Sequence, residues 1–210
     1  MLKIPLILAT RNDGKIAEFK EILSGFHVEL RSLKDFGPLP PIVEDGMTFD
    51  ENAYKKAHLT AKILGFPALA DDSGLLVEAL GGEPGVLSAR YAGEGATDEE
   101  NNRKLLKAME GVLNRKATFV CVISIAAPKG PALTYEGICE GEVTQEIIGE
   151  NGFGYDPIFY YPPRRKTFAQ MTPEEKNRIS HRGKAMADLK REFDKVFLWM
   201  DQRMAEGPFF

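Results

Sequence analysis

Four polar stretches interrupt otherwise apolar parts of the chain, and the first is a turn with residues that suit anion binding. It reads Thr10-Arg11-Asn12-Asp13-Gly14-Lys15 and separates an apolar run from a helical pattern. Backbone N–H groups at a helix N-terminus and a lysine ammonium both attract phosphates. The usual phosphate-binding loop has a second glycine, and a Ser or Thr where this chain has Ile16. The turn therefore also fits a helix start chosen for its capping residues, with Lys15 in solvent.

Two adjacent carboxylates, Asp71 and Asp72, lie between the apolar stretches "PALA" and "LLVEAL". Neighbouring carboxylates repel each other unless a cation or hydrogen bonds compensate. Mg²⁺ prefers one or two carboxylates together with waters and substrate phosphates, so Asp72 with Glu44 is a candidate magnesium site. Asp-Asp-Ser-Gly is also common turn chemistry, which is the structural alternative.

The stretch "NGFGYDPIFYYP" predicts a rigid loop that carries aromatic rings and a carboxylate. Phe153 and Tyr155 flank Gly154, and Asp156 precedes a proline. Aromatic loops usually belong to the core. Here the glycines are expected to leave a ring face accessible, and ring faces stack on nucleobases.

The stretch "EEKNRISHRGKA" belongs with this aromatic loop to the fourth polar stretch, the second being "VEDGMTFDENAYKKA", and it places His181 and Arg182 at the start of a predicted helix. We expect that position to expose Arg182 to an anion or a carbonyl oxygen. A lone histidine is more often structural than catalytic, so His181 keeps both interpretations open.

Length, charge and cysteine content exclude several classes of protein. The chain has 210 residues, 43% of them hydrophobic, which suffices for a core without disulfides. A net charge of -4 argues against a broad nucleic-acid-binding face. Cys121 and Cys139 lack metal-ligand spacing and suggest buried thiols in a reducing compartment. No signal-peptide pattern precedes Ile4, and no apolar run approaches the roughly 20 residues that span a bilayer. We expect a soluble, cytoplasmic protein with no membrane or nucleic-acid partner.

Periodicity and capping patterns predict an α/β protein with one mixed sheet and helices packed around it. Strands are expected over 4–9 and 28–33, two short strands around a polar turn over 67–82, and a long hairpin over 117–149. Helices are expected from the apolar periodicity that begins at Ile16 to Gly25, from the Thr48/Glu51 capping pattern to Leu64, from the Thr97/Glu100 pattern to Met109, from Thr172, and after Ser180.

Several motifs, taken in order, make a specific resemblance. They are "T-x-N-x-x-K" from Thr10 to Lys15, "ADDSGL" followed by "GGEPGVLSARYAG", "GFGYDPIF" and "SHRGKA". The sequence resembles the non-canonical purine nucleoside triphosphate pyrophosphatases, the inosine triphosphatase family, over nearly its whole length. The resemblance implies a single domain over 1–210, with an elongated mixed sheet and two lobes around a substrate cleft. It also implies a homodimer and Mg²⁺-dependent hydrolysis of ITP, dITP and XTP to the monophosphate and pyrophosphate, which cleanses the nucleotide pool.

The resemblance also implies a role for each matching residue. Asp72 is the catalytic base, and Glu44 with Asp72 binds the metal. The triphosphate is held by Thr10, Arg11, Asn12, Asp13, Gly14, Lys15 and Ser73. The base and the rest of the substrate contact Phe153, Gly154, Tyr155, Asp156, Lys176, His181 and Arg182. The residues alone leave Asp71 open as an alternative base.

Two other functions remain as alternatives. A non-hydrolytic nucleotide sensor could use the same turn and aromatic loop, but carboxylates facing a phosphate give a mere anion binder no advantage. A related pyrophosphatase could act on modified pyrimidine nucleotides. Product analysis over a panel of bases separates these alternatives.

Overall fold

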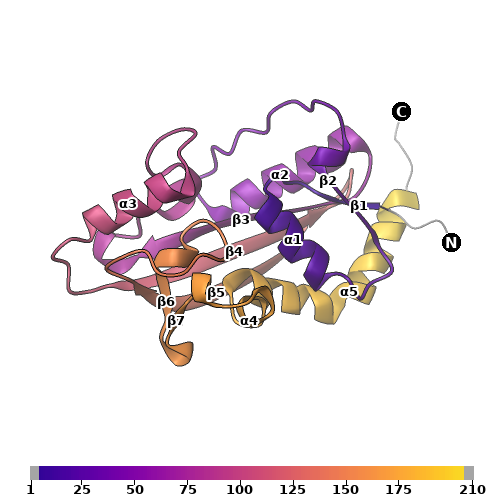
Figure 1. Cartoon of the computed structure of the whole chain (residues 1–210). Helices are drawn as coiled ribbons and strands as arrows, with labels where there is room; N and C mark the ends of the chain where they lie inside the picture. The colour runs from indigo at the N-terminus through magenta and orange to yellow at the C-terminus, as the bar shows by residue number, and fades with distance from the viewer. Residues whose placement is uncertain (1–4, 206–210) are drawn as a thin grey trace. The chain divides into compact units, whose positions relative to one another are not determined.

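The computed structural model describes residues 5–205, which form a mixed sheet of seven strands with five α-helices (Figure 1). The strands are β1 (Pro5–Leu8), β2 (Glu29–Ser32), β3 (Ala68–Val77), β4 (Lys116–Ala126), β5 (Leu133–Val143), β6 (Phe159–Tyr161) and β7 (Lys166–Thr167). The helices are α1 (Asp13–Ile22), α2 (Phe49–Leu64), α3 (Asp98–Ala108), α4 (Pro173–Asn177) and α5 (His181–Ala205). The strand order is β2-β1-β3-β4-β5-β6-β7. Since β1 runs parallel to β2 and β3 while β6 runs antiparallel to β5 and β7, the predicted mixed sheet is confirmed.

The chain divides into two compact units, and each is described by itself. The first unit comprises the described parts of 1–72, 122–136 and 185–210. The second unit comprises 73–121 and 137–184. The strand β3 therefore passes from the first unit to the second between Asp72 and Ser73. A single functional domain over 1–210 stays a prediction.

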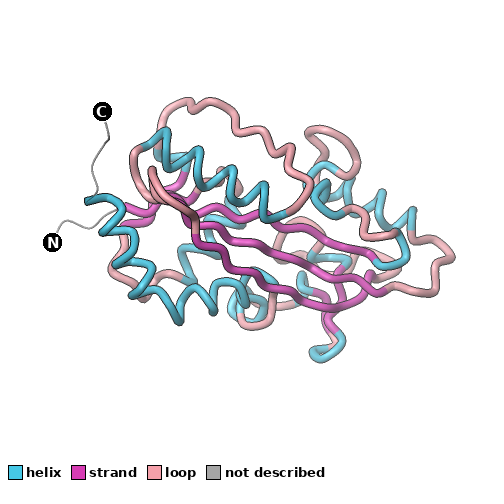
Figure 2. The backbone as a smooth tube through the Cα atoms, turned by 180° about the vertical axis from the view of Figure 1, so that it is seen from behind, coloured by secondary structure: helices cyan, strands magenta, loops and turns pink. Residues whose placement is uncertain are grey.

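In the first unit, α2 and α5 lie on opposite sides of the strands, as the two views agree (Figures 1 and 2). The buried face of α2 carries Ala57 and Ala61, which pack against Ile7 of β1 and Ala68 of β3. Small side chains let the helix backbone approach the strands closely. The sequence predicts an apolar side of α5, and all of its residues but the half-buried Phe197 are buried: Met186, Leu189, Phe193, Val196 and Met200.

The second unit has its own aromatic core. The ring centroid of Phe119 on β4 lies 4.5 Å from that of Phe159 on β6 and 5.9 Å from that of Phe168. Leu105 and Met109, at the end of α3, are fully buried in the same cluster. This core supports both α3 and the loop before β6, and that loop carries candidate site residues.

Local capping patterns predicted most helix starts correctly. Thr97 and Glu100 form a reciprocal capping box at α3, as predicted. At α2 the Thr48 hydroxyl accepts from the Glu51 N–H, while the Glu51 carboxylate accepts from the N–H of Met47 instead of that of Thr48. The long hairpin of β4 and β5 and the short helix α4 are also confirmed. Ile4, at the start of the first predicted strand, lies outside the described residues.

The prediction of two short strands over 67–82 is wrong. Residues Ala68–Val77 form one continuous strand, with the Asp71–Gly74 stretch inside it. The strand lies between β1 and β4 in the sheet, with β1 paired to its first part at Ala68 and Leu69, so pairing within the sheet holds it extended despite a composition that favours turns. The two aspartates are therefore neighbours on a strand, where successive side chains point to opposite faces.

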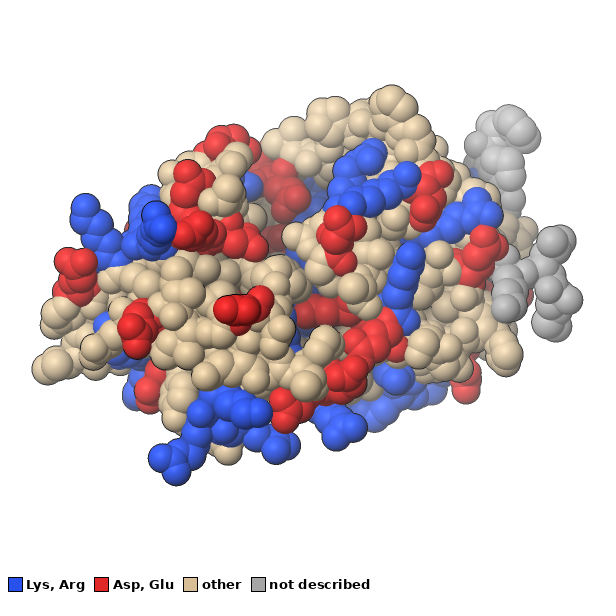
Figure 3. All heavy atoms as spheres, in the orientation of Figure 1, with Lys and Arg blue, Asp and Glu red and all other residues tan. Residues whose placement is uncertain are grey.

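Charged side chains of both signs are mixed on the one face that Figure 3 draws. In Figure 3, Lys and Arg side chains alternate with Asp and Glu over the described residues of the face shown. Within 5–205, no helix combines the length and the apolar composition of a bilayer-spanning segment.

Candidate functional site

The turn from Thr10 to Lys15 is the N-terminus of α1, and its polar side chains hold it in shape. Asn12 is the N-cap, and its Oδ1 accepts from the Lys15 backbone N–H at 3.0 Å. The Thr10 Oγ1 accepts from the Asn12 N–H at 3.2 Å. Arg11 is exposed, and the Asp13 carboxylate accepts from Lys34 at 2.5 Å near the surface. The capping interpretation is confirmed, and it leaves the anion-binding interpretation open.

The Lys15 side chain does not extend into solvent, so that part of the structural alternative is wrong. Its Nζ lies 3.0 Å from Oδ2 of Asp71, and the side chains are 18% and 1% exposed. A helix start thus carries an ammonium whose position is fixed by a buried carboxylate on β3.

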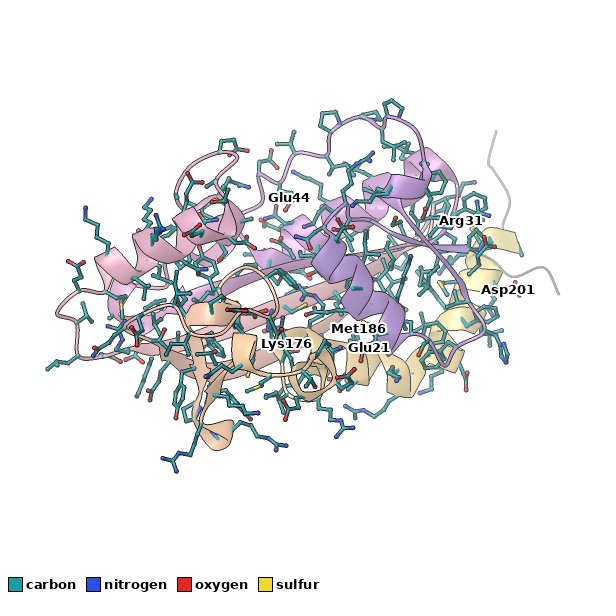
Figure 4. The ribbon with its side chains drawn as sticks, in the orientation of Figure 1. Glu21, Arg31, Glu44, Lys176, Met186 and Asp201 are labelled. Atoms are coloured by element: carbon teal, nitrogen blue, oxygen red, sulfur yellow. The ribbon has the colours of Figure 1, made fainter. Side chains whose placement is uncertain are left out.

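Asp72 faces away from its neighbour and meets α2. Its Oδ1 lies 3.1 Å from Nζ of Lys56, and its Oδ2 accepts from Nδ2 of Asn52 at 3.1 Å. The same Lys56 ammonium donates to Oε2 of Glu44 at 2.9 Å, and Figure 4 shows Glu44 in the loop that leads to α2. Asn52 also accepts from the N–H of Gly46 at 2.8 Å, which holds this loop against the helix. Two carboxylates therefore share one cation.

Burial and charge shift the pKa values of this cluster in identifiable ways. Burial raises the pKa of Asp72 above its ordinary value, although the ammoniums of Lys56 and Lys15 oppose the shift. Burial by itself lowers the pKa of Lys56, but attraction to Asp72 and Glu44 outweighs it, so the Lys56 pKa is raised. Lys56 thus stays charged at neutral pH, and the Asp72 carboxylate is a stronger base than one in water.

In the second unit, a buried ion pair lies beside the aromatic loop. Nζ of Lys176 lies 2.6 Å from Oδ2 of Asp156, and both side chains are nearly inaccessible. The same carboxylate oxygen accepts from the Phe153 N–H at 2.9 Å. The Lys176 ammonium also lies 4.6 Å from the centroid of the Phe153 ring, and Figure 4 shows Lys176 on α4. Phe153 itself is half-buried.

The expectation that the start of α5 exposes Arg182 is wrong. Arg182 is 1% exposed, its NH2 donates to Oγ of Ser73 at 3.0 Å, and its guanidinium carbon lies 5.6 Å from the Phe153 ring centroid. His181 is buried too and stacks on Phe119, with centroids 4.4 Å apart. A close approach explains this burial, because a Cβ on Gly183 would lie 1.7 Å from the carbonyl oxygen of Asn177.

Of the two aromatic residues that flank Gly154, Phe153 is partly accessible, as the sequence predicts, and Tyr155 is not. The Tyr155 ring is buried in the core, and its hydroxyl donates to the carbonyl oxygen of Ser88 at 2.8 Å. Burial raises the pKa of Tyr155, so it stays neutral. Gly154, between them, has a φ of 61°, in the left-handed region that favours glycine.

Residues 6–192 match the model of the Ham1 family. This chain belongs to the Ham1 family. It is 60% identical over 204 residues to a dITP/XTP pyrophosphatase of Desulfotalea psychrophila, covering 97% of this chain and 92% of that one. It is 59% identical over 201 residues to a protein of the same name from Syntrophobacter fumaroxidans, covering 96% and 87%. The resemblance inferred from the motifs is confirmed.

Solved structures of other Ham1 proteins have the same fold. A HAM1 protein from Coxiella burnetii matches with a TM-score of 0.84 and 44% identity, covering 91% of this chain and 99% of that one. The Ham1 protein of Staphylococcus aureus matches with a TM-score of 0.81, again at 44% identity and with the same coverage. The mixed sheet with flanking helices is therefore the fold of this family.

The donors in this Ham1 chain fit a magnesium ion better than a closed metal cage. Among residues 5–205, no three His, Cys, Asp or Glu side chains are grouped so that they could hold a metal. Glu44 and Asp72 already face one cation, the Lys56 ammonium. Mg²⁺ usually takes one or two carboxylates and completes its octahedron with waters and phosphates. Glu44 and Asp72 are such a pair.

Sequence reasoning gave no site role to Asn52 or Lys56 of this Ham1 member. A signal for both is present, because they lie four residues apart on α2, beside the buried Ala53 and Ala57. Polar side chains on the buried face of a helix need partners. Their partner is Asp72, whose position in the middle of a strand the sequence did not reveal.

Proposed function

We propose that this Ham1 protein hydrolyses non-canonical purine nucleoside triphosphates, namely ITP, dITP and XTP, to the nucleoside monophosphate and pyrophosphate. Removing these nucleotides keeps them out of DNA and RNA. The names of the relatives support the substrate class. The observation that carries the proposal is the pair of aspartates on β3, each held by a lysine from a different helix. Such an arrangement offers both anion-binding cations and a water-activating carboxylate.

In this proposal the turn at the N-terminus of α1 supplies most of the groups that bind the triphosphate. A triphosphate carries several negative charges, and the ammonium of Lys15 with the N-terminus of α1 attracts them. Gly14 lets the backbone approach the phosphates. The rest of the phosphate-binding set consists of Thr10, Arg11, Asn12 and Asp13 in the turn and Ser73 at the start of the second unit.

Glu44 and Asp72 hold the metal, for which we propose Mg²⁺. When bound, the ion neutralises phosphate charge and orients the phosphates for attack. Asp72 accepts a proton from the attacking water, and its raised pKa suits that role. We favour Asp72 over Asp71 as the base, since the Asp71 carboxylate is 1% exposed and already paired with Lys15. Lys15 then stabilises charge on the departing pyrophosphate.

The second unit binds the base. The Phe153 ring offers a stacking face, and Asp156 holds both the Phe153 backbone and Lys176 in place. Arg182 and His181 are the candidate donors to the 6-oxo group of hypoxanthine or xanthine. Gly154 and Tyr155 complete the proposed base-binding set. Adenine carries an amino group at that position and leaves the donors unpaired, which disfavours ATP.

We further propose that two copies of the chain form a homodimer that acts in the cytoplasm. Sedimentation equilibrium at micromolar concentration tests the dimer, and a monomer there contradicts it. Fractionation of cells that express the tagged protein tests the compartment, and recovery with membranes or outside the cytoplasm contradicts it.

Product analysis tests the proposed reaction directly. The purified protein is incubated with Mg²⁺ and, in turn, with ITP, dITP, XTP, GTP, ATP and a modified pyrimidine triphosphate, and products are separated by anion-exchange chromatography. We expect the monophosphate and pyrophosphate from the first three. Release of diphosphate and orthophosphate places the cleavage elsewhere. Tight binding of the nucleotides without any product supports a non-hydrolytic nucleotide sensor. Turnover confined to the modified pyrimidine triphosphate supports a pyrophosphatase that acts on modified pyrimidine nucleotides.

A further inference from the structure

Two side chains of α3, one helical turn apart, hold the peptide groups on either side of Gly154. Oδ2 of Asp98 accepts a hydrogen bond from the Gly154 N–H at 2.6 Å. Nδ2 of Asn102 donates a hydrogen bond to the Gly154 carbonyl oxygen at 2.9 Å. A spacing of four residues places both side chains on the same face of the helix. We call this pair of hydrogen bonds the Gly154 clamp.

The burial of Asn102 indicates that it has a purpose other than filling the core. The residue is 3% exposed, and its Oδ1 is a buried oxygen without a hydrogen-bond partner among residues 5–205. An unpaired buried amide oxygen destabilises the folded state, and an apolar side chain of similar size avoids that cost. Turning the amide over does not help, because its oxygen then faces the Gly154 carbonyl oxygen. Among the described residues, the Asn102 amide makes a hydrogen bond to the Gly154 carbonyl oxygen, and this bond explains why an asparagine is buried here.

The segment held by the clamp is the part of the loop that carries Phe153. Gly154 has no side chain to anchor it, and its left-handed φ of 61° is a conformation that glycine also leaves easily. On one side of it, Tyr155 is anchored by its hydroxyl to Ser88. On the other side is Phe153, whose ring lies against the Lys176 ammonium. The clamp fixes the backbone between an anchored residue and the half-buried Phe153 ring.

We infer that Asp98 and Asn102 are positioning residues that hold the Phe153 ring in the orientation in which it stacks on the purine. The inference rests on the proposed function, which assigns Phe153 to the base. A preorganised ring does not have to be ordered by the substrate, so the clamp contributes to binding. We expect its loss to raise the KM for ITP and to leave kcat nearly unchanged.

A double-mutant cycle with Phe153 tests the inference. Asn102→Ala is expected to raise KM for ITP about three- to tenfold, the effect of one hydrogen bond in a buried setting. Phe153→Ala is expected to raise it about tenfold or more through lost stacking. If Asn102 acts through Phe153, the double variant has the KM of Phe153→Ala alone. Effects that multiply overturn the inference.

Asn101 provides a matched control on the same helix. It is also 3% exposed, but both ends of its amide have partners. Its Oδ1 accepts from the N–H of Ala92, and its Nδ2 donates to the carbonyl oxygen of Ala89. Asn101→Ala is expected to lower the melting temperature about as much as Asn102→Ala, while its effect on KM multiplies with that of Phe153→Ala. An equal coupling of both asparagines to Phe153 means that any loss of stability moves the ring, and this contradicts a specific clamp.

Asp98 tests the other half of the clamp from an exposed position, where folding is less at risk. Asp98→Ala is expected to raise KM, and Asp98→Asn to restore most of the parent value, because its amide oxygen still accepts from Gly154. Hydrogen exchange provides a readout besides activity. Peptides covering 152–156 should exchange faster in Asp98→Ala and Asn102→Ala than in Asn101→Ala. Unchanged exchange in both clamp variants overturns the inference, whereas a parent protein that forms no monophosphate from ITP overturns the proposed function and leaves the exchange result standing.

Discussion

The Lys15 ammonium on α1 and the Asp71 carboxylate on β3 form an ion pair, with Nζ and Oδ2 3.0 Å apart. The aspartate is almost fully buried, and the lysine keeps part of its surface in solvent. Because a buried carboxylate holds the Lys15 ammonium, the charge stays in one place. Binding of an anion then does not have to order a mobile lysine side chain. We propose that the pair thereby prepares the helix start for an anion.

Lys15→Ala should weaken recognition of the triphosphate. Loss of one charged hydrogen bond costs about 1.5–3 kcal/mol, or roughly a 10- to 100-fold fall in kcat/KM for ITP. The ratio of ITP to ATP turnover should hardly change, because the charge acts on the phosphates. Steady-state kinetics measures both, with Lys20→Ala, an exposed lysine of the same helix, as control. Normal kinetics with lost base selectivity contradicts the assignment.

Asp72→Asn should abolish most turnover and leave the fold intact. The amide keeps the shape but cannot take a proton from water, and a positioned base contributes about 10²- to 10⁴-fold to kcat. Asp71→Asn is the matched comparison, and it should raise KM more than it lowers kcat, because it releases Lys15. Circular dichroism checks the fold. If Asp71→Asn loses kcat while Asp72→Asn retains it, Asp71 is the base.

Features that depend on residues close together in the chain could be predicted from the sequence, whereas features that depend on pairing with distant segments could not. The capping box of Thr97 and Glu100 spans one helical turn, so its pattern is legible in the chain. The continuous β3 depends on neighbouring strands that come from elsewhere in the sequence. Local composition alone therefore predicts a turn at Asp71 and Asp72. Their mutual repulsion is relieved because the strand sends them to different helices, where Lys15 and Lys56 compensate each charge.

Lys56→Met should raise the pKa of Asp72 further in the metal-free protein. Burial already raises this pKa, and the Lys56 ammonium is the main opposing influence, because a nearby positive charge favours the ionised carboxylate. The carboxyl carbon shift of Asp72, followed by NMR against pH, should therefore show a higher midpoint in the variant. Lys55→Met, which removes the neighbouring lysine paired with Asp45, should leave the midpoint in place. A lower midpoint in Lys56→Met contradicts this electrostatic account.

Arg182→Ala should narrow the preference for oxo purines. In the parent we expect ITP, dITP and XTP to exceed ATP in kcat/KM by roughly 10²-fold or more, since adenine leaves buried donors unpaired. The variant loses one donor and the anchor to Ser73, so the ratio should fall. Arg178→Ala, an exposed arginine just before α5, should keep it. Equal kcat/KM for ATP and ITP in the parent protein refutes the prediction.

Gly183→Ala should destabilise the protein, because its new Cβ would lie 1.7 Å from the Asn177 carbonyl oxygen. Overpacking of this kind costs about 1–3 kcal/mol, or a melting temperature lower by roughly 3–10 °C. Gly25→Ala serves as control, since a Cβ there meets nothing within 4 Å. Thermal unfolding by calorimetry measures both, and equal melting temperatures show that the α4–α5 turn relaxes freely.

The order in which the segments of the two units follow one another along the chain has a consequence for synthesis on the ribosome. The second unit ends at Lys184, while the first unit needs the residues that follow, including the buried Met186 and Phe193 of α5. Chains grow from the N-terminus, and structure can form as each segment emerges. The turn at Thr10, which we propose to bind phosphate, is thus among the earliest segments translated, yet it belongs to the unit whose packing is finished last.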